Sequence, residues 1–294
     1  MTRASAILRR YGIRPRKRLG QSFLEDRSVM EKIVAAAEID RDDFVVEIGA
    51  GVGIMTELIA ARAEKVIALE IDPLLADILR ERVGGEGNVE IVEGDALAFD
   101  LPLAARRSAK GRLKIIGNVP YYISSPILFA VIAARQAIES AVMMLQEEVA
   151  DRIVAAPGSK VYGIPSVIAS MYAALSREMT VPADCFYPPP KETSSVIRLV
   201  IRERPLIDLC DHDFFRKIVK IAFSRRRKTI LNNLKSGLAP GGFSEKDIHD
   251  ALREAEIDGQ RRGETLSALE YGVMSNILFS VMERQKSLDK KIRP

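Results

Sequence analysis

The stretch FVVEIGAGVG, at residues 44–53, decides the fold class. A short, mostly apolar run from Phe44 to Ile48 leads into alternate glycines, and the helical pattern MTELIAARA (55–63) follows at once. A strand that turns into a helix through glycines is typical of a βαβ unit. Glycines at this turn let a ligand approach the backbone and let the helix N-terminus face it. The spacing is G-x-G-x-G and not the G-x-G-x-x-G of dinucleotide sites, since position 54 is Ile.

Strand and helix patterns alternate on both sides of this turn. Helical spacing covers 28–39, 74–83 and 125–135, and strand-like runs cover 65–72, 89–96, 113–121, 140–146 and 194–202. This alternation predicts an α/β fold with a doubly wound, mostly parallel, Rossmann-like sheet. Later segments have only helical patterns, at 213–237, 244–257 and 266–288. We therefore predict a first domain over 1–205 and a small all-α domain over 206–294, with the boundary near 203–212.

The charges are unevenly distributed along the 294 residues, although the net charge is only +4. Residues 1–20 carry seven Lys or Arg and no acid, and residues 213–235 carry eight bases and one acid. Residues 38–100 between them carry 16 acids and five bases. A charge run is commonly just a solvated face, but two basic segments flanking an acidic body favour a surface for a polyanion.

Composition argues against several other classes of protein. No apolar stretch approaches the roughly 20 residues that span a bilayer, so no membrane partner is expected. The cysteines, Cys185 and Cys210, form no disulfide framework, which favours a reducing cytoplasm. The Arg-rich N-terminus also permits an organelle transit peptide. His212 and His249 are the only histidines, so we expect no metal site.

Acidic residues stand at the ends of the next two predicted strands. Glu70 ends the second strand 21 residues after Gly49, and an acid about 20 residues on typically binds ribose hydroxyls. Asp72 is a competing candidate for that role. Asp95 ends the third strand, where the alternative is a helix cap. Carboxyl ends of parallel strands meet at one edge of the sheet, so these acids and the glycine turn indicate a nucleoside-type ligand.

The next strand ends in GNVPYYIS, at residues 117–124, and this segment carries the predicted chemistry. Adenine N6 is a poor nucleophile because its lone pair is delocalised into the ring. The side-chain oxygen of Asn118 and a backbone carbonyl near Pro120 can each accept an N6 hydrogen bond and aim that lone pair at an electrophile. Tyr121 can stack on a base removed from its helix. The structural alternative is an Asn-led turn with core aromatics.

Several longer motifs stand in a fixed order along the chain. They are KRLGQSFL (17–24), VEIGAGVG (46–53), ALEID (68–72), EGDA (93–96), GNVPYYIS (117–124), MLQEEVADRIVAAPGSKVYG (144–163), FYPPPKETSSVIRL (186–199) and AFSRRRKTILNNL (222–234). With these motifs the chain resembles the rRNA adenine N6-dimethyltransferases over nearly its whole length. Within that family it is most similar to the branch that acts on the bacterial small ribosomal subunit.

The resemblance implies a class I methyltransferase domain that uses S-adenosylmethionine. Together with the glycine turn, it assigns cofactor contacts to Gln21, Ser22, Leu24, Gly49, Gly51, Gly53, Glu70, Asp95 and Asn118. Asn118, Pro120, Tyr121 and Phe186 become catalytic residues, with the target base held between Tyr121 and Phe186. The sequence departs from the family at Ser22, Ala50 and Val119, where Asn, Pro and Leu are usual.

The resemblance also gives the basic segments a partner. Phosphate contacts are expected from Arg16, Lys17, Arg18, Arg225, Arg226, Arg227 and Lys228. The implied substrate is a pair of adjacent adenosines in the 3′-terminal hairpin loop of small-subunit rRNA, within an immature 30S-type particle. The alternatives are a large-subunit rRNA methyltransferase of the macrolide-resistance type and a catalytically silent assembly factor. We expect a cytoplasmic protein, with a monomer as the default state.

Overall fold

The computed structural model describes residues 3–292, and the side chains of residues 3–286. Its contacts divide the chain into two compact units, one with the residues up to 150 and 174–201, and one with 151–173 and the residues from 202 onward. The second break, between Ile201 and Arg202, lies close to the boundary that the sequence predicts. The assignment of 151–173 differs, because α8 (Ile164–Tyr172) packs against α9 (His212–Ala222) and α12 (Ala268–Ile292). Residues 1–2 and 293–294 of the predicted domains lie outside the described residues.

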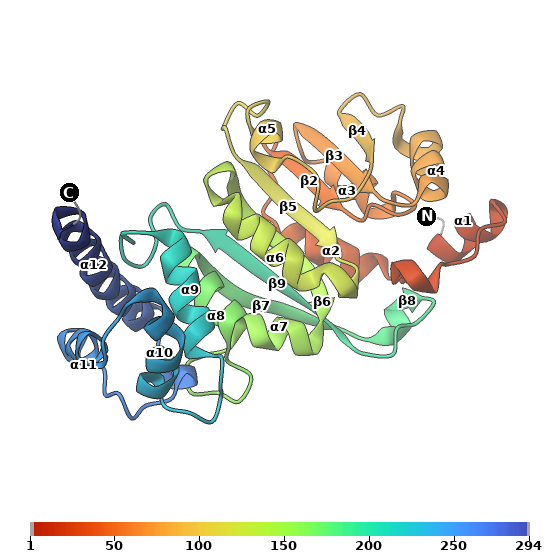
Figure 1. Cartoon of the computed structure of the whole chain (residues 1–294). Coiled ribbons are helices and arrows are strands. Elements are labelled where there is room, and N and C mark those ends of the chain that lie inside the picture. The colour runs from red at the N-terminus through yellow and green to blue at the C-terminus, as the bar shows by residue number, and fades with distance from the viewer. Residues whose placement is uncertain (1–2, 293–294) are drawn as a thin grey trace. The chain divides into compact units, whose positions relative to one another are not determined.

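The first unit is built on a seven-stranded sheet with the order β4-β3-β2-β5-β6-β9-β7 (Figure 1). Its strands are β2 (Phe44–Ile48), β3 (Lys65–Glu70), β4 (Val89–Glu93), β5 (Leu113–Asn118), β6 (Ile138–Gln146), β7 (Ala173–Val181) and β9 (Ser194–Ile201). The pairs β2–β3, β3–β4, β2–β5 and β5–β6 are parallel, and β6–β9 is antiparallel. The predicted mostly parallel, Rossmann-like sheet is therefore confirmed. The sequence patterns did not predict β7.

Helices connect and flank these strands. They are α1 (Ala4–Arg10), α2 (Arg27–Ala36), α3 (Ile54–Ala60), α4 (Pro73–Val83), α5 (Leu101–Ala105), α6 (Ser124–Ala133) and α7 (Glu147–Val154), with short 3-10 turns η1 (Lys17–Leu19), η2 (Tyr121–Ile123), η3 (Arg135–Ala137) and η4 (Ala183–Cys185). The basic N-terminal arm contains α1, whose Ile7 and Leu8 are buried in the core of this unit. The apolar side of that arm is thus part of the fold, while Arg9 and Arg10 stay exposed.

The strand order fixes where a ligand can bind. β2 lies between β3 and β5, so the connections that follow β2 and β5 leave in opposite directions along the sheet. Such a switch point opens a crevice at the carboxyl ends of the strands. A second, two-stranded sheet pairs β1 (Phe23–Leu24) with β8 (Phe186–Tyr187). This small sheet joins the segment before α2 to the proline-rich segment between β7 and β9.

The second unit is helical. Besides α8, α9 and α12 it contains α10 (Ile230–Leu238), α11 (Glu245–Glu254), η5 (Ala239–Gly241) and η6 (Gly263–Thr265). Phe215 and Tyr271 are fully buried at its centre. The Tyr271 hydroxyl donates a 2.9 Å hydrogen bond to the Gly263 carbonyl, so burial leaves that polar group satisfied.

The helix predicted over 213–237 is wrong in one respect, because the segment forms two helices separated by a turn. The side-chain amide of Asn233 donates to the carbonyls of Ala222 (2.7 Å) and Arg225 (3.2 Å), which satisfies the end of α9. Thr229 then caps α10 by accepting from the Asn232 N–H. Four successive charged residues, 225–228, offer no apolar side chain to bury, so a continuous helix gains nothing there.

Within residues 3–292, no helix is long and apolar enough to cross a membrane. The same part of the chain contains no group of His, Cys, Asp and Glu side chains arranged to hold a metal ion.

Candidate functional site

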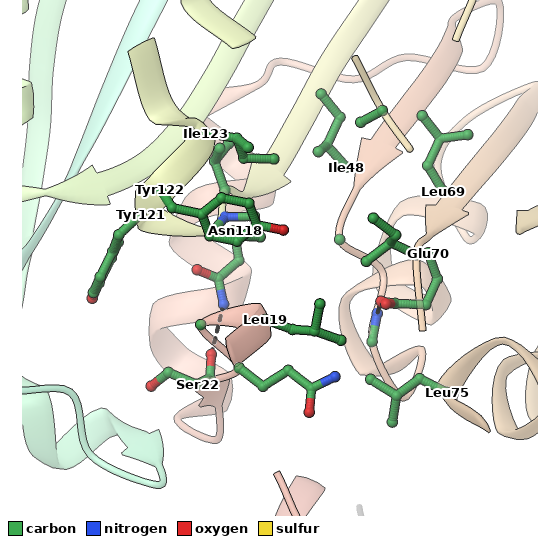
Figure 2. Close-up of a pocket in the computed structure, with 18 of the residues that line it drawn as sticks. Leu19, Ser22, Ile48, Leu69, Glu70, Leu75, Asn118, Tyr121, Tyr122 and Ile123 are labelled. Carbon is green, nitrogen blue, oxygen red and sulfur yellow. Dashed lines mark hydrogen bonds between the residues drawn. The ribbon is translucent and has the colours of Figure 1, made fainter. Parts of the chain in front are cut away.

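A cavity opens at the carboxyl ends of β2, β3 and β5, in the first unit (Figure 2). About 780 Å³ of space lies between its lining residues, a volume that includes open solvent. Most of the predicted site residues line it, and the structure thus brings together Gln21, Ser22, Gly49, Gly51, Glu70, Asp95, Asn118, Pro120 and Tyr121. Leu24, Gly53 and Phe186 are not among its lining residues.

The glycine turn has two separate reasons for its glycines. Gly49 has φ +75°, and a Cβ there would lie 3.1 Å from the Asn118 carbonyl oxygen, so glycine lets the turn approach the end of β5. Gly53 has φ +84°, and its Cβ would lie 2.7 Å from Cδ1 of Leu79. The space beside Gly53 is therefore filled by a side chain of α4. Glycine is needed at this position for packing, although the sequence predicts a cofactor contact.

Glu70 ties two turns together at the floor of the cavity. Its carboxylate accepts hydrogen bonds from the backbone N–H of Gly51 (2.8 Å) and of Asp72 (2.9 Å). Burial raises the pKa of Glu70, while these two hydrogen bonds act in the opposite direction. Each carboxylate oxygen can accept a further hydrogen bond, so the side chain keeps capacity for ribose hydroxyls.

Asp72, the competing candidate for the ribose contact, is otherwise engaged. It is 1% exposed and accepts from Arg16 Nη1 at 3.0 Å and from Gln21 Nε2 at 2.8 Å. It also caps α4 through the Leu74 N–H. Asp72 does not line the cavity, which favours Glu70 for that role. The predicted phosphate contact of Arg16 thus competes with a buried carboxylate.

Gln21 and Asp95 line the cavity but have local partners as well. The Gln21 side chain accepts from the Arg16 backbone N–H at 2.7 Å while its amide nitrogen donates to Asp72. Asp95 is exposed and accepts from the Leu97 N–H at 2.9 Å, which closes a turn, whereas the cap of the next helix, α5, is Asp100. The hydrogen bond from Leu97 still leaves Asp95 able to accept from a ligand in the cavity, since a carboxylate has four acceptor positions.

Asn118 projects from the end of β5 with its amide nitrogen already bound. Nδ2 donates a 3.0 Å hydrogen bond to the backbone carbonyl of Ser22, the dashed line in Figure 2. Among residues 3–286, no hydrogen bond engages its Oδ1. Because Ser22 contributes its backbone here, the departure from the usual Asn does not affect this contact. The Ser22 hydroxyl donates instead to the Pro188 carbonyl at 2.8 Å.

The two rings predicted to hold the target base, those of Tyr121 and Phe186, are both engaged in contacts within the chain. The Tyr121 hydroxyl is hydrogen-bonded to Ser194 Oγ at 2.9 Å, and burial raises its pKa. Phe186 is only 4% exposed, because the β1–β8 pairing places it opposite Leu24 in the hydrophobic core. Leu24 lines a second cavity beside the first, together with Gly49, Gly51 and Asn118.

Glu47 belongs to this region and was missed by the sequence reading. It is fully buried in β2, lines the second cavity and accepts from the Thr56 hydroxyl at 2.6 Å. Its Oε1 has no hydrogen-bond partner among residues 3–286, and burial raises the pKa of Glu47 to about 7. An acid inside the apolar run VVEIG was the available signal, since a buried carboxylate is rarely retained without a role.

We expect Glu47→Gln to remove a pH dependence of stability. The folded-state pKa, about 7, exceeds the ordinary 4.5, so the native state binds more protons between these values and stability falls as pH rises through them. The fall amounts to about 2–4 kcal/mol, at 1.36 kcal/mol per pKa unit. Glutamine keeps an acceptor for Thr56 and stays neutral. Urea unfolding at pH 5 and pH 8 should show the variant gaining stability over wild type at the higher pH, and parallel pH profiles would contradict the assignment.

Comparison with solved structures gives the class of protein. A dimethyladenosine transferase from Plasmodium falciparum is 26% identical, with a TM-score of 0.76 over 89% of this chain and 98% of that one. The structure of ErmE, a 23S rRNA methyltransferase, is also 26% identical, with a TM-score of 0.68 over 87% of this chain and 99% of its own. The fold is that of a Rossmann-like methyltransferase.

Residues 12–272 match the model of the family described as "Ribosomal RNA adenine dimethylase", and the chain belongs to that family. Curated relatives include the "Ribosomal RNA small subunit methyltransferase A" of Syntrophus aciditrophicus, 46% identical over 95% of this chain and 99% of that protein. The protein of the same name from Shouchella clausii is 43% identical over 96% of both chains. The predicted enzyme class, an rRNA adenine dimethyltransferase that uses S-adenosylmethionine, is confirmed.

Proposed function

We propose that this protein dimethylates N6 of two adjacent adenosines in the 3′-terminal hairpin loop of small-subunit rRNA. The observation that carries the proposal is the state of Asn118. Its Nδ2 is bound to the Ser22 carbonyl, so its Oδ1 remains as an acceptor at the wall of a cavity whose floor is formed by Glu70 and the glycine turn. The sequence identity is 43–46% to small-subunit enzymes and 26% to ErmE, which favours small-subunit rRNA over large-subunit rRNA as the substrate.

The residues of the cavity fit the cofactor. Glu70 would hold the ribose hydroxyls, Gly49 leaves room for close backbone approach, and Asp95 would contact the nucleoside from the cavity wall. Bound S-adenosylmethionine supplies an electrophilic methyl group. The glycine turn and Glu70 form one hydrogen-bonded unit, which keeps the binding surface ordered before the ligand arrives.

The reacting adenine is handled by the turn after β5. Asn118 Oδ1 accepts a hydrogen bond from N6–H, which draws the N6 lone pair out of conjugation with the ring and aims it into the cavity. The Pro120 carbonyl already accepts from the Ile123 N–H and retains a second lone pair for N6. The N6 proton becomes acidic once the methyl arrives, so it can leave to water. Tyr121 offers a stacking face, whereas Phe186 can serve only after leaving its core packing.

Mass spectrometry of rRNA tests the proposal. Small subunits lacking the modification are incubated with labelled cofactor and the protein, with large subunits in parallel. We expect two dimethyladenosines in small-subunit rRNA and none in large-subunit rRNA. Label in the large subunit would support the resistance-type alternative, and absence of label in both would support a catalytically silent assembly factor.

We further propose that the substrate is an immature 30S-type particle and that the protein acts as a monomer in the cytoplasm. Both Cys185 and Cys210 are free, in keeping with a reducing compartment. Phosphate contacts are proposed for two places, Lys17 with Arg18 in the first unit and the turn over 225–228 in the second. All these side chains are exposed.

The turn in the second unit divides its basic residues into two groups. Arg226 pairs with Glu264 at 3.2 Å and also donates to the Lys160 carbonyl. The side chains of Arg225, Arg227 and Lys228 have no partner among the described residues. We propose that these three, and not Arg226, bind phosphates.

Changing Arg225, Arg227 and Lys228 together to Gln is expected to weaken binding to immature small subunits. The log–log salt dependence should become shallower by roughly 0.7–0.9 per lost phosphate contact. Arg226→Gln is the matched control. It removes one charge from the same turn, but Arg226 is already paired with Glu264 and is not expected to bind a phosphate. Titrations of binding against salt measure both. Equal changes in slope for the control, or none for the triple variant, would count against this surface.

A further inference from the structure

A second aromatic ring at the cavity has no role in the chemistry described above. Tyr122 lines the cavity and is 55% exposed, whereas the ring of Tyr121 beside it is half-buried. In Figure 2 the Tyr121 ring points away from Glu70, while the Tyr122 ring extends toward the Glu70 side of the opening. No hydrogen bond holds the Tyr122 hydroxyl within the described chain. Packing of the core therefore does not explain this ring.

The ring is nevertheless held in place from one side. A Cβ on Gly20 would lie 3.7 Å from Cδ1 of Tyr122 and 3.9 Å from Cβ of Pro120, so the ring and the proline both lie against the backbone at Gly20. Pro120 fixes the backbone just before the two tyrosines. An aromatic ring whose rotamers are already restricted loses little conformational entropy when a flat group stacks on its exposed part.

Basic residues precede Gly20, the glycine against which the ring lies. η1 (Lys17–Leu19) leads directly into Gly20, and Lys17 and Arg18 are exposed. No ion pair occupies either of them within residues 3–286. The segment that supports Tyr122 thus also carries two free cations. A stacking face beside cations that follow the backbone is the combination by which proteins bind single-stranded RNA.

We infer that Tyr122 stacks on the nucleobase adjacent to the target adenosine, while Lys17 and Arg18 contact the phosphates of that strand. The inference rests on the proposed function and adds a positioning residue to it. A nucleotide that leaves its helix exposes the face of its neighbour, and Tyr122 replaces the lost stacking partner. The neighbour is then fixed while Asn118 and Tyr121 hold the target.

A binding cycle with an RNA hairpin tests the inference. Tyr122→Ala should weaken binding of the hairpin by about 5- to 150-fold, the range expected for loss of one stacked base at 1–3 kcal/mol. Tyr122→Phe and Tyr122→Trp should stay within about threefold of wild type, because stacking needs no hydroxyl. A hairpin with an abasic nucleotide beside the target adenosine should bind wild type as weakly as the Ala variant binds the intact hairpin. The Ala variant should lose nothing further on the abasic hairpin.

Two controls separate stacking from a structural role. Hairpin binding is measured with S-adenosylhomocysteine at saturation, so that a change in cofactor affinity does not enter the comparison, and an unchanged free energy of unfolding of Tyr122→Ala excludes loosening of the Gly20 segment. Leu103→Ala removes a side chain of similar exposure (56%) that does not line the cavity, and should leave hairpin binding unchanged.

The outcomes distinguish this inference from the proposed function. Unchanged hairpin binding by Tyr122→Ala, or equal losses for the Phe and Ala variants, would overturn the stacking role even if wild type dimethylates the rRNA. Additive losses on the abasic hairpin would overturn it as well. Failure of wild type to methylate would instead overturn the proposed function, and the binding cycle would still report on stacking because it needs no methyl transfer.

Discussion

Asn118→Ala is expected to lower the rate of methyl transfer by about 10²–10³-fold while RNA binding stays near wild type. The hydrogen bond from adenine N6 to Asn118 Oδ1 matters most as N6 becomes tetrahedral, so its loss raises the barrier more than it weakens the bound state. Single-turnover transfer to unmodified small subunits measures the rate, and filter binding measures affinity for the particle.

Asn118→Asp is the matched variant for this prediction. It keeps an acceptor oxygen at the same position but loses the Nδ2 hydrogen bond to the Ser22 carbonyl. We expect it to retain more activity than Ala if the acceptor is what catalysis needs. Should Asp and Ala be equally impaired, Asn118 would act by holding the Ser22 segment, and an Ala variant with wild-type rates would exclude both roles.

Glu70→Ala is expected to weaken binding of S-adenosylmethionine by about 10- to 150-fold. A hydrogen bond to a charged group contributes about 1.5–3 kcal/mol, and every 1.4 kcal/mol is tenfold in Kd. The variant also leaves the backbone N–H groups of Gly51 and Asp72 without their acceptor, which adds to the loss by loosening the glycine turn. Calorimetry measures the dissociation constant directly.

Asp72→Asn provides the contrast. Asp72 does not line the cavity and reaches it only through its hydrogen bond with Gln21, so its replacement should affect cofactor binding less than Glu70→Ala. A larger effect at Asp72 than at Glu70 would reverse the assignment of the ribose contact. An unchanged Kd for Glu70→Ala would have the same consequence.

Much of the sheet could be predicted because parallel strands are buried on both faces. The apolar runs that contain β2, β3 and β5 are nearly continuous for that reason, and their order along the chain is enough to align their carboxyl ends. The glycine turn, Glu70 and Asn118 therefore could be assigned to one edge of the sheet before any coordinates. Their roles toward ligands remain predictions.

Prediction from local sequence patterns failed where a residue's role depends on contacts with distant segments of the chain. Asp72 and Glu70 stand two positions apart and look alike in the sequence, but only Asp72 meets Arg16, a residue 56 positions away. The resemblance assigns Phe186 to the target base, but the pairing of its segment with β1 buries the ring. The break between α9 and α10 likewise depends on Asn233 reaching back to Ala222.

The sequence by itself determined the fold class, the family and the edge of the sheet at which the chemistry is expected, because periodicity and strand order are local properties of the chain. Only the tertiary structure decided which carboxylate faces the cavity, which arginines of the basic turn are free, and that Tyr122 is the exposed ring while Phe186 is the buried one. Those outcomes depend on burial and on contacts between segments far apart in the chain. Which of these contacts form depends on distances in the folded chain, and the local periodicity of the sequence does not encode those distances.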